Sequence, residues 1–215
     1  MPRRKYPSFS RSFAQNHSVN EAVILKYLAY KVNRSNNWRD DKQWYFGSTK
    51  ALQKQFPYIS ASAIDANIRK MGKKPILEIG NYNPWKQDRT RWFHVPKVTR
   101  DEVFKGKMIR FESDDAVHHG ITAAVLLHNL RHNLKKELKK SDDTNVAHEM
   151  SPAALSKIQP KTGMSFLPFS ESTIKATLKA LVEKGVILKT STTKPEYTLP
   201  PSEMQDLRRE AKLKS

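Results

Sequence analysis

Residues 59–77, ISASAIDANIRKMGKKPIL, join a helical pattern to a strand pattern in one run. Ser60 can cap a helix in which apolar residues, among them Ile64 and Ile68, recur at helical spacing. After Gly72 the pattern changes to the alternation that is typical of a β-strand. The run therefore predicts a helix followed by a strand, and a similar run occurs a second time in the chain.

Residues 169–187, FSESTIKATLKALVEKGVI, repeat the run at an offset of 110. Three further blocks match in the same order: 22–28 with 124–130, 51–57 with 154–160, and 93–96 with 197–200. Ordered blocks whose offsets change only between them indicate two copies of one fold with loops of different length. The alternative is a chance match of apolar periods.

Each copy is predicted to hold three helices followed by a β-hairpin. In the first copy we expect helices over 19–33, from Ser48 or Thr49 to just before Pro57, and over 60–72, with strands at 76–79 and 92–95 and a third short strand at 43–46. In the second we expect helices over 120–139, 152–158 and 171–183, strands at 186–189 and 196–199, and a terminal helix within 202–215.

This order of elements is that of the winged helix, a form of helix-turn-helix. The predicted fold class is α+β, mainly helical, with two tandem winged-helix domains. The expected organisation is a basic N-terminal arm over 1–17, winged-helix domains over 18–97 and 113–200 with a linker over 98–112, and a basic C-terminal helix or tail over 201–215.

The charge of the chain points to a polyanionic partner. The 215 residues hold 39 Lys and Arg against 21 Asp and Glu, and the net charge is +14 in residues 1–100 but +4 in 101–215. Such a field attracts nucleic acid, although basic charge can also serve solubility alone. There is no Cys, no run of apolar residues long enough to span a membrane, and no secretory signal pattern. We expect a cytoplasmic protein that does not contact membranes.

Motifs for catalysis are sparse. The sequence has neither the glycine-rich phosphate loop nor the dinucleotide-binding glycine pattern, and it has no H-E-x-x-H. His128 and His132 are four residues apart on a predicted helix, which could place two imidazoles on one metal, but no third ligand is well placed. Polar positions on an exposed helix face explain them better. We expect a non-enzymatic protein that uses no cofactor or metal.

The third helix of each copy is where a winged helix places side chains in the major groove of DNA. Its outward positions carry hydroxyl and cationic groups that suit phosphates and base edges. The predicted contacts on these helices are Ser60, Ser62, Arg69, Lys70, Ser172, Lys175 and Lys179. The alternative is an ordinary solvated face, which Asp65 and Glu171 favour because acidic groups repel phosphate.

The hairpin loop of the first copy, the wing, gathers amides, guanidinium groups and aromatic rings. Its predicted contacts are Asn81, Asn83, Lys86, Arg89 and Arg91, and those of the second, shorter wing are Lys189 and Lys194. Alternation along the strand places Arg89 and Arg91 on one face, opposite Trp92. With Trp92 packed inward, both guanidinium groups point outward. Alternatively, Tyr82 or Trp85 folds back onto the hairpin.

The N-terminal arm carries Arg3, Arg4 and Lys5. Basic arms of this kind follow a DNA groove, so these three residues are also predicted DNA contacts. The alternative is a tail that only increases solubility.

Four stretches of the first copy carry a resemblance: Ala22–Leu28, Trp44–Ser48, Phe56–Ile64 and Gly80–Phe93, with the Asp-Arg-Thr-x-Trp-aromatic run as the most specific part. They resemble winged-helix proteins of bacteriophages and plasmids that act as replication initiators or replisome organisers. The resemblance covers about 75 residues of the first copy and, more weakly, the second. It implies binding near an origin and recruitment of host replication proteins. The chain departs from that group because a second winged helix replaces the helicase-loader region.

The sequence thus predicts a protein of a phage, plasmid or other mobile element that binds double-stranded DNA, as a replication initiator or organiser or as a transcriptional regulator. The second copy either binds an adjacent half-site or mediates homodimer or partner contacts. The alternative from another class is a protein-binding inhibitor or adaptor that docks on a host nucleic-acid machine, such as a CRISPR effector or a polymerase.

Overall fold

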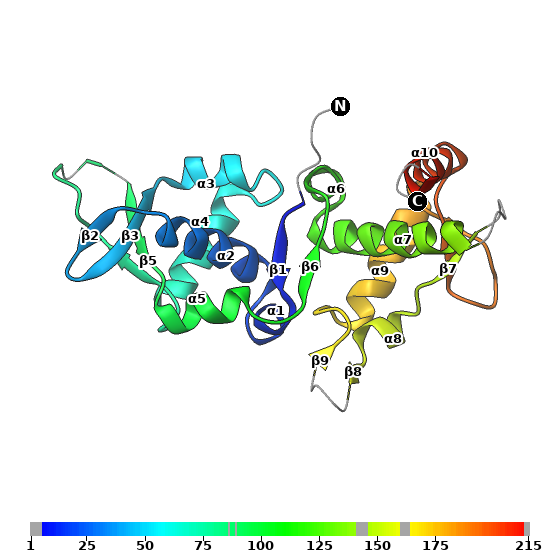
Figure 1. Cartoon of the computed structure of the whole chain (residues 1–215), viewed down its shortest axis with the longest axis horizontal. Helices are drawn as coiled ribbons and strands as arrows, with labels where there is room; N and C mark the ends of the chain where they lie inside the picture. The colour runs from blue at the N-terminus through cyan, green and yellow to red at the C-terminus, as the bar shows by residue number, and fades with distance from the viewer. Residues whose placement is uncertain (1–5, 86, 89, 141–145, 160–163, 213–215) are drawn as a thin grey trace. The chain divides into compact units, whose positions relative to one another are not determined.

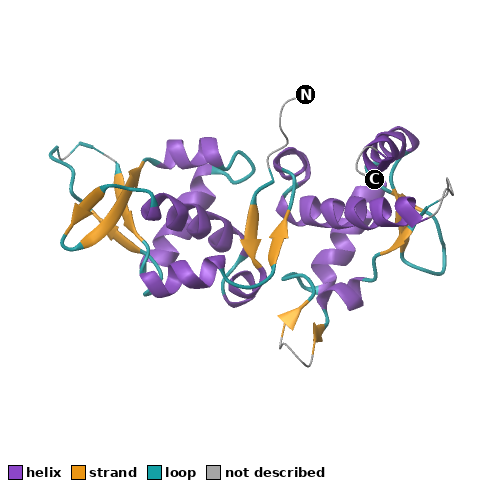
Figure 2. Cartoon of the chain, in the orientation of Figure 1, coloured by secondary structure: helices purple, strands orange, loops and turns teal. Residues whose placement is uncertain are grey.

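The computed structural model describes residues 6–85, 87–88, 90–140, 146–159 and 164–212. Within them the chain is α+β and mainly helical, as predicted, with small antiparallel sheets (Figures 1 and 2). It divides into two compact units: residues 7–109, which we call the N-terminal unit, and the residues from 110 onwards together with Tyr6, which we call the C-terminal unit. No helix among the described residues has the length and apolar character needed to cross a membrane.

The N-terminal unit contains five helices and six strands among its described residues. The helices are α1 (Arg11–Asn16), α2 (Val19–Asn33), α3 (Thr49–Gln55), α4 (Ala61–Gly72) and α5 (Lys97–Phe104). The strands are β1 (Ser8–Ser10), β2 (Asn37–Arg39), β3 (Lys42–Gly47), β4 (Glu78–Gly80), β5 (Arg91–His94) and β6 (Met108–Arg110).

Serine caps set the starts of the three predicted helices. The Oγ atoms of Ser18, Ser48 and Ser60 accept hydrogen bonds from the backbone N–H three residues on, at 3.1, 3.2 and 3.2 Å. Each bond satisfies an amide that the helix itself leaves without a partner. Helix α3 ends two residues before Pro57, because the residue that precedes a proline disfavours helical geometry. Local signals therefore located these helices correctly.

The sheet of this unit has the antiparallel order β2-β3-β5-β4. Strand β3 was predicted as a third short strand, but β2 was not predicted. Asp40 and Asp41 join β2 to β3 with positive φ angles of 49° and 58°, which is the geometry of a tight hairpin turn. In the register of β3 and β5, Tyr45 is opposite Phe93 and Phe46 is opposite Trp92.

The core of the N-terminal unit lies between α2, α4 and one face of the sheet. Ile24, Leu28, Ile64, Ile68 and Phe93 are all fully buried. Removal of these side chains from water provides the main stabilisation of the unit.

Residues 7–17 are not a free arm. They form β1 and α1, and Phe9 and Phe13 are buried at 0% and 3% exposure. Strand β1 pairs with β6, and α5 packs on α2, so the stretch expected to be a linker over 98–112 contains ordered elements. The apolar residues in these segments are too few for a periodic signal, and the pairing of β1 with β6 joins residues about 100 positions apart.

The C-terminal unit contains five helices and five strands among its described residues. The helices are α6 (Ser113–His119), α7 (Ile121–Lys140), α8 (Pro152–Ser156), α9 (Glu171–Glu183) and α10 (Pro201–Lys212). The strands are β7 (His148–Glu149), β8 (Ile158–Gln159), β9 (Met164–Ser165), β10 (Leu188–Lys189) and β11 (Glu196–Thr198), with the sheet order β10-β11-β7. Helix α10 was predicted, whereas α6 and the β8-β9 hairpin were not.

Both units contain a long helix, a strand, two shorter helices and two further strands, and that strand pairs with the last one: β3 with β5 in the N-terminal unit and β7 with β11 in the C-terminal unit. The N-terminal unit has the additional strand β2 before β3, and the C-terminal unit has the β8-β9 pair between α8 and α9. Ile64 in α4 and Ile174 in α9 are both at 0% exposure, as the repeat requires. The short second helix differs between the units, because Leu52 of α3 is buried whereas α8 contains no buried residue.

Candidate nucleic-acid interface

The solvent face of α4 begins at its N-cap. Ser60 Oγ caps the helix and lies 3.1 Å from Ser62 Oγ, and both side chains are exposed, as predicted. Ala66, one turn further, is exposed as well. Because Ile64 and Ile68 hold the opposite face in the core, the exposed residues in the N-terminal half of α4 are Ser62 and Ala66, and Asp65 beside them is partly exposed. Such a surface allows the close approach of a ligand backbone.

Asp65 connects α4 to the wing strand. Its carboxylate forms ion pairs with Arg69 of α4 and Arg91 of β5. The hydrogen bond from Arg91, with a further one from Arg69, holds the pKa of Asp65 below its usual range. The Arg69 side chain is 72% exposed and still faces solvent, but that of Arg91 is only 30% exposed. Arg91 is therefore a link between strand and helix.

The orientation of β5 is the reverse of the predicted one. Phe93, not Trp92, packs into the core, so Arg91 lies on the core side with it. Trp92 lies on the outer face of the sheet, where its ring centroid is 5.0 Å from that of Phe46 and 5.4 Å from that of Tyr82. The prediction that Arg91 points outward opposite an inward Trp92 was wrong, because register with Tyr45 decides which alternate set is buried.

Lys70 forms an ion pair with a buried carboxylate. Glu21 in the first turn of α2 is at 0% exposure, and its oxygens lie 2.7 Å from Lys70 Nζ and 3.3 Å from Lys74 Nζ. His17 Nδ1 lies 3.6 Å from the same carboxylate, while burial, reinforced by Lys74, lowers the pKa of His17. A buried charge requires partners, so Lys70 has a structural role as a partner of Glu21. Only a phosphate contact was predicted for Lys70 from the sequence.

Asn83 closes the wing from inside. Its Nδ2 donates to the carbonyl oxygens of Asp88 and Thr90 at 3.0 and 2.6 Å, and its Oδ1 accepts from Trp92 Nε1 at 2.8 Å. Asp88 accepts from the Thr90 N–H at 2.8 Å, and hydrogen bonding to Thr90 lowers the pKa of Asp88. Asn83 is thus half-buried and hydrogen-bonded within the wing, whereas Asn81 is exposed, and the DNA contacts of both stay predictions.

The two rings of the wing behave differently. Tyr82 folds back onto the hairpin, where its ring lies 5.1 Å from that of Trp44 and its hydroxyl donates to Asp40 at 2.5 Å. Trp85 is 72% exposed. Five predicted contacts, namely Arg3, Arg4, Lys5, Lys86 and Arg89, lie outside the described residues.

Helix α9 repeats the pattern of α4. Ser170 Oγ caps the helix by accepting from the Thr173 N–H at 3.2 Å and lies 3.0 Å from the exposed Ser172 Oγ. Lys175 is exposed, and Lys179, with a 78% exposed side chain, lies 3.7 Å from Glu183. Both units therefore start their third helix with a solvent-exposed Ser-x-Ser pair and then expose cations.

The second wing also carries exposed cations. Lys189 at the end of β10 and Lys194 in the turn before β11 are both exposed, as predicted. The charge is uneven along the chain: residues 7–109 carry a net +11 and residues 110–215 a net +4, with a further +3 in residues 1–6.

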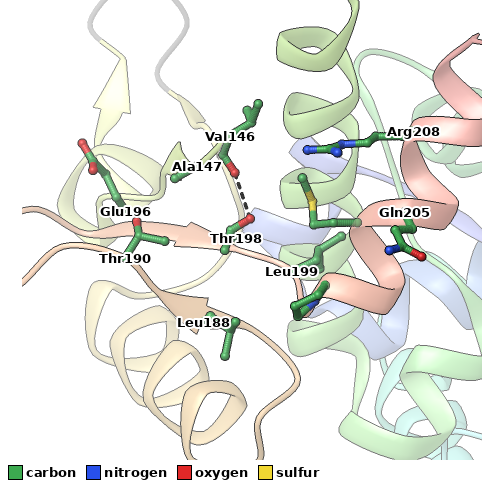
Figure 3. A pocket seen from close by; sticks show the side chains of 11 residues that line it. Val146, Ala147, Leu188, Thr190, Glu196, Thr198, Leu199, Gln205 and Arg208 are labelled. Atoms are coloured by element: carbon green, nitrogen blue, oxygen red, sulfur yellow. Dashed lines mark hydrogen bonds between the residues drawn. The ribbon is translucent and has the colours of Figure 1, made fainter. Parts of the chain in front are cut away.

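The C-terminal unit has a pocket of about 550 Å³ beside β11 and α10 (Figure 3). Leu188, Leu199 and Met204 line it, and at its wall Thr198 Oγ1 donates to the Val146 carbonyl at 2.8 Å. Further polar residues of its lining are Glu196, Gln205 and Arg208.

Sequence reasoning missed two cations of the N-terminal unit, Arg39 and Lys42. They are opposite one another across the β2-β3 turn, and both are exposed. The Asp40-Asp41 pair between two short polar-aromatic runs was the only local signal for this hairpin.

Comparisons with protein-family models, with curated proteins and with solved structures found no match.

Proposed function

We propose that the chain binds double-stranded DNA through two winged-helix units, with α4 and α9 as the helices that enter the major groove. The succession of elements supports this assignment, because α3 and α4 in the first unit, and α8 and α9 in the second, are followed by two paired strands, although the β8-β9 pair lies between α8 and α9. The observation that carries the proposal is the shared surface of α4 and α9. Each starts with exposed Ser-x-Ser hydroxyls, while its buried stripe faces the core.

The charge distribution supports the N-terminal unit as the main source of affinity. Its net +11 attracts the phosphate backbone, and the exposed Arg69 side chain lies on the same face as Ser62. The C-terminal unit, with net +4, adds Lys175 and Lys179 on α9 and is suited to an adjacent half-site.

The resemblance of the first unit to phage and plasmid proteins supports a cellular role in replication initiation or organisation. Transcriptional regulation uses the same DNA-binding physics and is the related role. Docking on a host nucleic-acid machine without DNA contact is the competing outcome of the experiment below.

The first test is duplex binding by the full chain across salt. If about six phosphates are neutralised, the logarithm of the association constant falls with the logarithm of salt with a slope of roughly −5. If the chain does not bind duplex DNA but co-purifies with a host protein complex after nuclease treatment, the docking function replaces this proposal.

The second test changes one charge on α4. Ser62→Glu puts an acid in the first turn, where the helix dipole favours it, so folding is retained. The same carboxylate repels phosphate, and we expect duplex affinity to fall about tenfold or more. The matched control is Val98→Glu, an equal change of charge at a 71% exposed position in the first turn of α5. Equal losses in both variants would mean that net charge alone, and not the face of α4, determines binding.

A further inference from the structure

We propose that the outer face of the N-terminal sheet stacks unpaired nucleobases of a single DNA strand. This aromatic face consists of Phe46, Tyr82 and Trp92 with Arg39 beside them. It deepens the proposed DNA-binding function and rests on it only for the assumption that the ligand is nucleic acid.

The rings of the aromatic face form one continuous layer. The Trp92 centroid lies 5.0 Å from Phe46, at an interplanar angle of 38°, and 5.4 Å from Tyr82, at 78°. Tyr82 in turn covers Trp44, which is buried. Phe46 is 46% exposed, so the layer has an open edge of aromatic surface.

Hydrogen bonds hold this layer in place before any ligand arrives. The indole N–H of Trp92 is held by Asn83, and the hydroxyl of Tyr82 is held by Asp40. Rings that are already fixed lose little conformational freedom on binding, which favours affinity. The loop between β4 and β5 adds Trp85, 72% exposed, as a second open ring.

The charges favour a polyanion over a second copy of the chain. The Arg39 guanidinium is exposed and lies 5.8 Å from the Trp92 ring centroid, and the unit as a whole carries net +11. Two copies of such a unit repel each other, whereas a nucleic-acid strand is attracted. Lys42 pairs with Glu78, whereas the Arg39 guanidinium lies over the Trp92 ring.

The ligand is a single strand because flat rings recognise base faces. In a duplex those faces are covered by neighbouring base pairs, whereas an unpaired strand can place them on aromatic side chains. The aromatic face also lies on the side of the sheet away from Phe93 and the core, since Trp92 and Phe93 alternate along β5. The α4 surface and the aromatic face are therefore separate, and one protein can hold duplex and unpaired DNA together.

The test uses the full chain with an oligothymidylate of about 15 nucleotides and, separately, a duplex. Phe46→Ala should weaken oligothymidylate binding about fivefold or more and leave duplex affinity within about twofold. The matched control is Ile79→Ala, because Ile79 has a similar exposure of 42% on the other face of the same sheet. Ile79→Ala should leave both affinities unchanged. Quenching of tryptophan fluorescence by the oligonucleotide should accompany binding.

Three outcomes would overturn the inference, and two would separate it from the proposed function. Unchanged oligothymidylate binding by folded Phe46→Ala would do so, as would equal losses in Phe46→Ala and Ile79→Ala. A change in sedimentation mass with Phe46→Ala and no effect on the oligonucleotide would identify the face as a contact between copies. Loss of duplex binding alone in Ser62→Glu, with Phe46-dependent oligothymidylate binding intact, would separate the two sites. A wild-type chain that binds oligothymidylate through Phe46 but no duplex would contradict the proposed function and leave this inference standing.

Discussion

Replacement of Asn83 by alanine should destabilise the N-terminal unit, because this amide holds the wing together. The substitution removes three hydrogen bonds: two donated to the carbonyls of Asp88 and Thr90 and one accepted from Trp92. Each such bond contributes about 0.5–1.5 kcal/mol net, and water replaces part of the loss at a half-exposed site. We therefore expect the free energy of unfolding to fall by about 1–2 kcal/mol.

The measurement is thermal unfolding of the full chain by calorimetry and near-ultraviolet circular dichroism. For a unit of about 100 residues, a loss of this size lowers the melting temperature by about 5–15 °C. The control is Gln87→Ala, an exposed amide in the same loop, which should leave the melting temperature unchanged. If Asn83→Ala melts like the wild type but binds duplex DNA more weakly, Asn83 is a DNA contact and its amide does not hold the wing together.

Three further outcomes are expected. Ile64→Val and Ile174→Val should each lower the unfolding free energy of their own unit by about 1 kcal/mol, and each should lower the temperature of only one of two calorimetric transitions. If either variant lowered both transition temperatures, the two units would not unfold independently. Burial lowers the pKa of His17 and of His128, so below about pH 6.5 the unfolded chain binds more protons than the folded chain. The unfolding free energy should therefore decrease from pH 7 to pH 5, and a flat pH profile would contradict this. Arg131→Met should lower the unfolding free energy of the C-terminal unit by about 3–5 kcal/mol, because three partly buried carboxylates lose their shared cation. Denaturant unfolding measures this loss, and a much smaller value would contradict the prediction.

The sequence alone determined the local elements and their repetition. The caps at Ser18, Ser48 and Ser60 act within three residues along the chain, so the starts of α2, α3 and α4 were readable from composition and spacing. The apolar stripes of α4 and α9 likewise follow from a period of 3.6 residues, which is why Ile64 and Ile174 were correctly placed in the two cores.

The roles of the polar groups in the candidate interface depend on tertiary contacts. Lys70 meets Glu21, 49 positions earlier, and Arg91 meets Asp65, 26 positions earlier, so no local pattern could reveal that these cations are engaged. The face on which Trp92 lies was equally undetermined, because a strand with apolar residues at both Trp92 and Phe93 can bury either set. Pairing with β3 resolves this choice in favour of Phe93, and the register thereby leaves Trp92 and its neighbouring rings on the outer face of the sheet.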